Sequence, residues 1–174
     1  TKGESRAAVL KRMQVAMDRT FDELWAKRTA RTPVKNRAET MSLAAIVEKE
    51  TSVPSERRTV AGVYANRLAV GMRLQADPTI IYPITKGKPL GRRILRSEIQ
   101  AVNDYNTYSM AGLPKGPIAN PGRDSIAAAL DPEPHDYLYF VAKGDGSHIF
   151  SRTLAEHNAN VQKWYAIRRE RGEM

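Results

Sequence analysis

The chain has 174 residues, which is enough for one domain with a substantial buried core. It has no cysteine, which excludes disulfides and thiolate metal sites, and its three histidines are too widely spaced for a local zinc motif. The net charge of +9 suits nucleic acid, an anionic membrane or an acidic polymer; because no nucleic-acid-binding motif is present, we expect no nucleic-acid partner, and we expect no metal and no cofactor.

Residues 4–29 have the spacing of one long amphipathic helix. Apolar side chains recur at intervals of three and four residues, at Leu10, Met13, Met17, Phe21, Leu24 and Trp25. This stripe is either a core face of the domain or a docking face for another part. Because Pro33 interrupts the pattern, we expect a lead-in helix within residues 1–35 and the main domain in residues 36–174, together forming one compact unit.

A second helix is predicted to run to Glu50. It starts at Thr32 or at Asn36, and Asn36 has the spacing of a capping box with Glu39. Pro54 prevents the helix from continuing much further. Glu50 therefore lies in a last turn beside a loop, where a ligand can reach it.

Glu50 lies on the apolar side of this helix. It follows Val47 by three residues and Ile46 by four, so it extends from the same stripe. Glu48 and Lys49 are expected to face water. Burial should raise the pKa of the Glu50 carboxyl, as a general acid near neutral pH requires. On spacing alone, the alternative is a glutamate at a helix end that bends outward into solvent.

The next two segments differ in character. A third helix is predicted over residues 55–70, with Gly71 as its C-cap. Residues 72–85 are expected to be irregular or extended, with a turn followed by a short strand at residues 79–82.

The middle of the chain is rich in loops. Ser97 can cap a short helix, and Asn120 can cap another that runs to Leu130. Residues 103–122 are dense in amides, hydroxyls and tyrosine rings, and a polar stretch of this length in a compact domain is usually functional. These groups suit a sugar, although other polar ligands would also fit.

The end of the chain predicts a hairpin and a helix. Residues 137–141 and 148–150 read as strands joined by a turn at residues 144–147. Thr153 and Glu156 have the spacing of a capping box for a final helix. The predicted class is α+β: a mostly helical single domain with a small antiparallel sheet.

Between residues 40 and 164 the chain carries a series of motifs in a recognisable order. They are residues 44–51 (AAIVEKET), 60–68 (VAGVYANRL), 71–79 (GMRLQADPT), 105–108 (YNTY), 112–114 (GLP), 117–122 (PIANPG), 137–141 (YLYFV) and 148–158. This order resembles the YceG-like family, the endolytic murein transglycosylases of bacteria. Several motifs in one order are far more specific than any single motif.

The resemblance implies a lysozyme-like active-site helix with Glu50 as the catalytic residue, the second Glu of the Glu-Lys-Glu triplet. The implied reaction cleaves the β-1,4 bond between N-acetylmuramic acid and N-acetylglucosamine within glycan strands. It leaves a 1,6-anhydro-muramic end, and it terminates or trims nascent strands. The alternatives are a hydrolytic muramidase and a non-catalytic glycan-binding module.

Substrate binding is expected from side chains in the matching motifs: Gln75, Asp77, Thr79, Tyr82, Asn106, Tyr108, Leu113 and Asn120. Some of these have alternative structural roles; Asp77, for instance, can form an Asx turn. Asn66 is expected to bond a neighbouring backbone group. Glu56 and Arg57 are expected to form an exposed ion pair of little consequence.

The resemblance also implies partners and a location. The implied partners are the glycan strands of peptidoglycan and cell-wall synthases. The family is anchored by one span in the bacterial inner membrane, with its catalytic domain on the periplasmic or extracytoplasmic face. No apolar run here approaches the roughly 18 residues that cross a bilayer, so we expect this chain to be a soluble catalytic fragment that lacks the N-terminal anchor.

Overall fold

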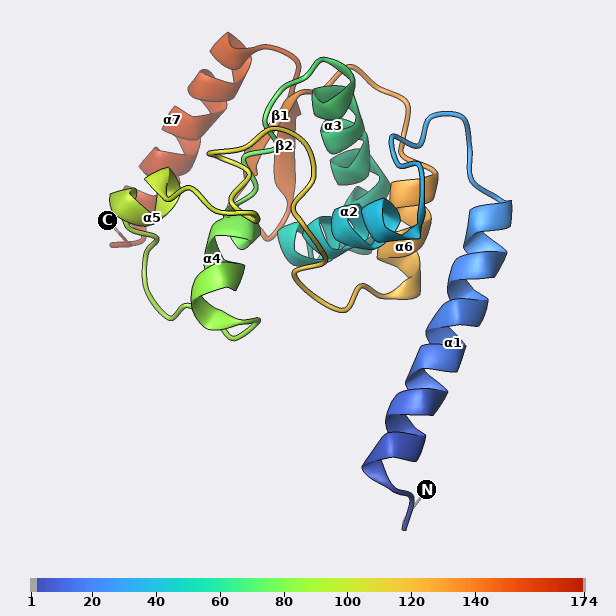
Figure 1. The fold of residues 1–174 in the computed structure, drawn as a ribbon. Coiled ribbons are helices and arrows are strands. Elements are labelled where there is room, and N and C mark those ends of the chain that lie inside the picture. Colours follow the sequence, from blue (N-terminus) through green and yellow to red (C-terminus); the bar gives the residue numbers. More distant parts are fainter. Residues whose placement is uncertain (1–2, 174) are drawn as a thin grey trace.

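The computed structural model describes residues 3–173 and shows a mostly helical fold with an antiparallel hairpin (Figure 1). This confirms the predicted α+β class. No helix among the described residues is long and apolar enough to span a membrane. The elements, in chain order, are α1 (Arg6–Ala26), α2 (Arg37–Glu50), the 3-10 turn η1 (Pro54–Glu56), α3 (Arg57–Ala69), α4 (Asp77–Thr85), α5 (Arg96–Gln100), α6 (Arg123–Leu130), β1 (Tyr139–Ala142), β2 (His148–Ser151) and α7 (Leu154–Glu170).

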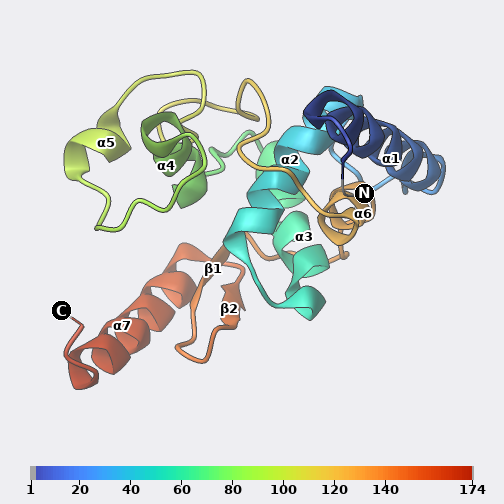
Figure 2. The ribbon, with the colours of Figure 1, turned by 90° about the horizontal axis from the view of Figure 1, so that it is seen from below.

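Helices α2, α3 and α6 form the centre of the molecule (Figures 1 and 2). Leu43, Ile46 and Val47 of α2 are fully buried, which confirms the predicted apolar stripe. Ala128 and Ala129 of α6 are also buried, and their small size lets α2 and α6 approach closely. Burial of each large aliphatic side chain in such a core contributes about 1.5–3 kcal/mol. The end of α2 is therefore firmly held.

Local capping decides where these helices begin and end. Asn36 is the observed start of α2: its side chain accepts the Glu39 N–H (3.0 Å), and the Glu39 carboxylate accepts the Lys35 N–H (2.7 Å). The other predicted start, at Thr32, is not used. The C-cap of α3 is Val70, one residue before the predicted Gly71; Gly71 follows it with φ +69°, and its N–H donates to the Leu68 carbonyl (3.2 Å).

Helix α1 is held to the molecule at its C-terminal end. Phe21 and Leu24 are buried in the core, whereas Leu10 and Met13 are 65% and 58% exposed. Figure 1 shows the N-terminal half of α1 extending away from the other helices. The predicted stripe is thus a core face over its last turns. A domain boundary at residue 35 stays a prediction.

The predicted strand at residues 79–82 was wrong, because these residues belong to helix α4. Asp77 and Pro78 occupy its first turn, where proline needs no N–H partner and a negative side chain suits the helix dipole. A short apolar run does not distinguish helix from strand by periodicity. In the described chain, strand pairing joins β1 to β2 alone.

Two predicted caps were also misplaced. Ser97 lies inside α5, where the Glu98 carboxylate accepts the Leu95 N–H (2.7 Å) and so caps the helix. Asn120 lies ahead of α6, whose N-cap is Gly122. In both places a residue near the expected one begins the helix.

The hairpin is fixed on two sides. Phe140 of β1 pairs with Phe150 of β2, and α7 packs against the hairpin (Figure 2). Thr153 and Glu156 form the predicted capping box of α7 (3.2 and 3.3 Å). From α3, the Asn66 amide donates to two backbone carbonyls just before β1 (2.7 and 3.0 Å), as expected for Asn66. These hydrogen bonds therefore attach the start of the hairpin to α3.

Candidate active site

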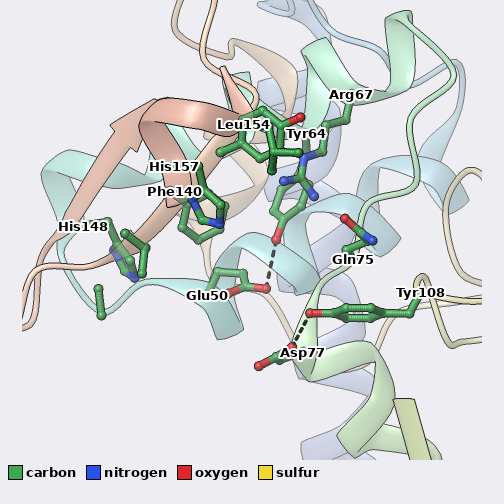
Figure 3. Close-up of a pocket in the computed structure, with 13 residues that line it drawn as sticks. Glu50, Tyr64, Arg67, Gln75, Asp77, Tyr108, Phe140, His148, Leu154 and His157 are labelled. Carbon is green, nitrogen blue, oxygen red and sulfur yellow. Dashed lines mark hydrogen bonds between the residues drawn. The ribbon is translucent and has the colours of Figure 1, made fainter. Parts of the chain in front are cut away.

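A cavity of about 320 Å³ lies where α2 ends, between α3, the start of α4, the hairpin and α7 (Figure 3). Its walls include Glu50, Gln75, Asp77 and Tyr108, all expected from sequence. They also include polar side chains that the sequence did not indicate as site residues: Tyr64, Arg67, His148 and His157.

Glu50 is the acid at the centre of this cavity. The Tyr64 hydroxyl donates a hydrogen bond to Glu50 Oε1 (2.9 Å; Figure 3). Burial raises the pKa of Glu50 to about 7; the nearby charge of Asp77 adds to the rise, while Tyr64 and Arg67 oppose it. Glu50 keeps part of its surface toward the cavity. Its carboxyl can therefore carry a proton near neutral pH and reach a ligand.

Asp77 and Tyr108 form a second polar pair in the cavity. The Tyr108 hydroxyl donates to Asp77 Oδ1 (2.6 Å), as Figure 3 shows. Asp77 is held by the first turn of α4 and contributes a negative charge that disfavours ionisation of Glu50. Burial, followed by the hydrogen bond to Asp77, raises the pKa of Tyr108. Tyr108 is therefore a neutral donor.

Gln75 lines the same cavity from an unusual backbone conformation. Its φ is +50°, in the left-handed region that residues other than glycine rarely adopt, and its N–H donates to the Thr107 carbonyl (3.2 Å). Strain of this kind tends to be retained at functional sites. Its amide extends into the cavity near Tyr108 (Figure 3).

Arg67 supplies a fixed positive charge. Its guanidinium donates to the Leu138 and Leu74 carbonyls (2.7 and 2.6 Å) and lies 5.4 Å from the centre of the Tyr139 ring. It is 7% exposed, so it joins α3 to the hairpin while its charge acts on the cavity. That charge lowers the pKa of Glu50, but the effect of burial is larger.

His148 enters the cavity from β2 and is held by Glu56. The Glu56 carboxylate accepts the His148 N–H (2.8 Å) and lies 2.7 Å from Nδ1. Burial alone would raise the pKa of Glu56, but the hydrogen bonds from His148 and Thr51 lower it. The expected exposed pair of Glu56 with Arg57 was therefore wrong.

His157 closes the cavity from α7. Its ring stacks on Tyr139 with centroids 5.2 Å apart, and its Nδ1 is buried without a hydrogen-bond partner among residues 3–173. Burial, with a smaller contribution from Arg67, lowers the pKa of His157. His157 is therefore a neutral, mainly aromatic wall at neutral pH.

Two of the expected substrate contacts are buried away from the cavity. The Asn106 amide donates to the Ile99 and Ala101 carbonyls (2.9 and 2.7 Å), and its oxygen accepts the Tyr108 N–H (3.0 Å). Thr79 is fully buried, where its hydroxyl bonds the Thr107 hydroxyl. The expectation that Asn106 and Thr79 contact substrate is corrected, because their polar groups are already used inside the protein. Asn106 positions Tyr108 instead.

Three further expected contacts lie on other surfaces. Tyr82 and Asn120 line a separate groove on the Lys49 side of α2. Leu113 lines another hollow near Pro33. These residues do not line the cavity at Glu50, and their role as substrate contacts stays a prediction. These residues belong to the same series of motifs as Glu50, but the fold places their side chains on other surfaces.

Glu48 was expected to face water, but it bonds to groups inside the protein instead. Its Oε2 accepts the Gly122 N–H (3.0 Å) and the Ser125 hydroxyl (2.6 Å), both at the N-terminus of α6. Burial acts to raise the pKa of Glu48, but these hydrogen bonds lower it overall. Glu48 therefore caps a neighbouring helix, since a carboxylate suits the positive end of the helix dipole.

The cavity brings together the Glu50 carboxyl, a second acidic side chain at Asp77, neutral donors and one fixed cation. Within residues 3–173, no three His, Asp or Glu side chains gather in a way that could hold a metal ion. A protonated carboxyl with a pKa near 7 can donate a proton and then act as a base. The arrangement fits proton transfer to and from a neutral polar substrate.

Several known proteins have sequences similar to that of this chain. Residues 1–163 match the YceG-like family. The chain is 40% identical over 131 residues to a protein of Bacillus subtilis named endolytic murein transglycosylase, covering 75% of this chain and 36% of that one. A protein of Streptococcus pneumoniae with the same name is 31% identical over 160 residues, covering 88% of this chain and 28% of its own length.

A solved structure agrees with the fold. The crystal structure of a yceG-like protein from Listeria monocytogenes matches with a TM-score of 0.63 and 42% identity, covering 70% of this chain and 38% of that one. The chain spans between 28% and 36% of the length of these curated relatives. On the match over residues 1–163, this chain belongs to the YceG-like family.

Proposed function

We propose that this chain is the catalytic part of an endolytic murein transglycosylase. It would cleave the β-1,4 bond between N-acetylmuramic acid and N-acetylglucosamine inside glycan strands and leave a 1,6-anhydro-muramic end. The names of the relatives support the substrate class. The observation that carries the proposal is the Glu50 carboxyl, partly buried in a cavity with a pKa of about 7.

The proposed first step is proton donation. Protonated Glu50 gives its proton to the glycosidic oxygen while the bond from C1 of muramic acid to that oxygen breaks. The N-acetylglucosamine portion leaves as an alcohol, and positive charge develops at C1. Asp77 favours the protonated form of Glu50 before this step, and Arg67 and the Tyr64 hydroxyl stabilise the carboxylate that remains after it.

The proposed second step closes the ring. The Glu50 carboxylate takes the proton from the C6 hydroxyl of muramic acid, and the C6 oxygen bonds to C1. Glu50 thus regains its proton, and no water is consumed. Ordinary glycosidases place two carboxylates across the bond. An internal hydroxyl benefits from the large effective concentration of intramolecular attack, so a second carboxylate is not required as base or nucleophile.

A hydrolytic muramidase is the main rival, and Asp77 gives it a specific basis because it is a second carboxylate in the cavity. In that reaction Asp77 would serve as the base for water or as the nucleophile. The bond that Asp77 accepts from the Tyr108 hydroxyl favours a positioning role instead. A non-catalytic glycan-binding module is the other rival, and a raised carboxyl pKa gives it no advantage.

The test is the mass of the products of purified glycan strands. The wild type is expected to produce fragments that are lighter than the hydrolytic products by one water. Asp77→Asn should produce the same fragments at a reduced rate. Reducing-end products that vanish in Asp77→Asn would favour the muramidase. Binding without any fragments would favour the glycan-binding module.

The cellular setting follows from the substrate and is also proposed. Murein lies outside the inner membrane of bacteria, so the catalytic part is expected on the periplasmic or extracytoplasmic face, held by an anchor in the parent protein. Cell-wall synthases that make nascent strands are the expected partners. Cross-linking in cells between the parent protein and a synthase would support this setting.

A further inference from the structure

We propose that the groove on the Lys49 side of α2 binds carboxylates of the peptide carried by the murein strand; this rests on the proposed function. The groove, which we call the lysine groove, has a volume of about 440 Å³ and includes Lys49, Tyr82, Lys86 and Asn120. An adjoining hollow shares Lys49 and Tyr82 and adds Lys88. Where the lactyl carboxyl of muramic acid is amide-linked to the peptide, the sugars carry no charge, so a cationic surface needs the carboxylates of the peptide.

The lysine groove is positively charged, and no acidic side chain lines it. Three lysines line it and its adjoining hollow, and none of the lining residues is acidic. Lys49, Lys86 and Lys88 make no ion pair with any residue in 3–173. Cations in a concave surface raise the local concentration of anions. The surface is therefore complementary to carboxylates.

Lys86 occupies a position that would suit glycine better. It is the C-cap of α4 with φ +54° and ψ +40°, in the left-handed region, and its N–H donates to the Tyr82 carbonyl (2.8 Å). The conformation is costly for a residue with a Cβ. It places the Lys86 ammonium 5.7 Å from the centre of the Tyr82 ring. The retained strain points to a use for this side chain.

The two sites share the same supporting elements. Lys49 precedes Glu50 on α2, so one residue lines the lysine groove and the next lines the cavity. Helix α4 contributes its first residue, Asp77, to the cavity and Tyr82 to the groove. In murein the peptide leaves the lactyl group of muramic acid, the sugar whose C1 bond would be cleaved. A strand bound at Glu50 can therefore direct its peptide toward the groove.

The experiment compares two strands that differ in peptide charge: one with free peptide carboxylates and one with the same groups converted to amides. Wild type should cleave the free-acid strand with the lower KM. Lys86→Gly and Lys49→Gln should each raise that KM about two- to five-fold and leave the amidated strand unchanged. Lys86→Gly also relieves the backbone strain, so its thermal midpoint should not fall.

Lys11→Ala is the matched control, because it removes the same charge from the exposed, projecting part of α1 (Figure 1). It should leave both KM values unchanged. Equal KM values for the two strands in the wild type would overturn the inference while leaving the proposed function intact. So would equal losses on both strands in the lysine variants, which would indicate a sugar subsite. Absence of cleavage on both strands in the wild type would instead remove the proposed function.

Discussion

Glu48 and Glu50 lie two residues apart on α2, yet their environments shift their pKa values in opposite directions. Glu48 bonds the start of α6 through Gly122 and Ser125, and its pKa is lowered. Glu50 faces the cavity, where it receives one hydrogen bond, from Tyr64, and its pKa rises to about 7. The two residues are of the same type and lie in the last turns of the same helix. Glu50 is the more deeply buried and has one donor, whereas two donors outweigh the weaker burial of Glu48; this balance decides which carboxylate is structural and which one can donate a proton.

The largest expected effect is on cleavage by Glu50→Gln. Glutamine keeps the shape but cannot donate the proton, so kcat should fall about 10²- to 10⁴-fold. Glu48→Ala should retain most of the kcat per folded molecule. Strand cleavage followed by mass spectrometry measures both, with circular dichroism to verify folding. Full activity in folded Glu50→Gln would remove Glu50 from the mechanism.

The next effect is on stability at alkaline pH. The pKa of Glu50 is about 7 when folded and 4.5 in its ordinary state. Below pH 4.5 both states are protonated, and the stability that the proton confers is lost as pH rises through 7. The free energy of unfolding of Glu50→Gln should therefore exceed that of the wild type by about 3 kcal/mol at pH 8 and equal it at pH 4. Urea unfolding at both pH values tests this; a gap that does not change with pH would contradict it.

Glu48→Ala should show a smaller effect with the opposite pH dependence. Loss of the two hydrogen bonds at the start of α6 should lower the free energy of unfolding by about 1–2 kcal/mol at pH 7. Because the pKa of Glu48 is lowered, this contribution is present above pH 4.5 and is lost as pH falls below it. The gap between Glu48→Ala and wild type should shrink in acid. If it grows instead, the assigned role of Glu48 is wrong.

The smallest effects should appear in the alkaline limb of kcat/KM. Asp77→Asn removes a charge that raises the pKa of Glu50, so the limb should move to lower pH. Tyr64→Phe removes a hydrogen bond that lowers this pKa, so the limb should move to higher pH. Opposite displacements are the informative result. Displacements in the same direction would indicate a general disturbance of the cavity.

The sequence predicted the parts of this molecule that depend on neighbouring residues. The apolar stripe through Ile46 and Val47 located Glu50 correctly, and the capping box of Thr153 with Glu156 located the last helix. Arg67 could have been found by the same reasoning, because it follows Tyr64 by three residues on an apolar helix face. A charged group on such a face requires either a partner or a function.

Contacts between distant segments could not be predicted in this way. His148 and His157 reach the cavity because α7 packs on the hairpin and both line the same cavity as Glu50, and neither has a local signal. Asn106 is of a residue type that often binds sugars, yet its amide donates to three carbonyls at the end of α5. Residue type showed that these groups were polar, and the fold alone showed whether they were already satisfied.

The most direct test of the account is a titration of the Glu50 carboxyl. Chemical shifts of carbon-13-labelled glutamate side chains, followed by NMR from pH 3 to pH 9, would report each carboxyl, and the signal absent in Glu50→Gln identifies this one. A midpoint of about 7 is expected for Glu50. A midpoint at the ordinary value of 4.5 would contradict it, because Glu50 would then be ionised and unable to donate a proton at neutral pH.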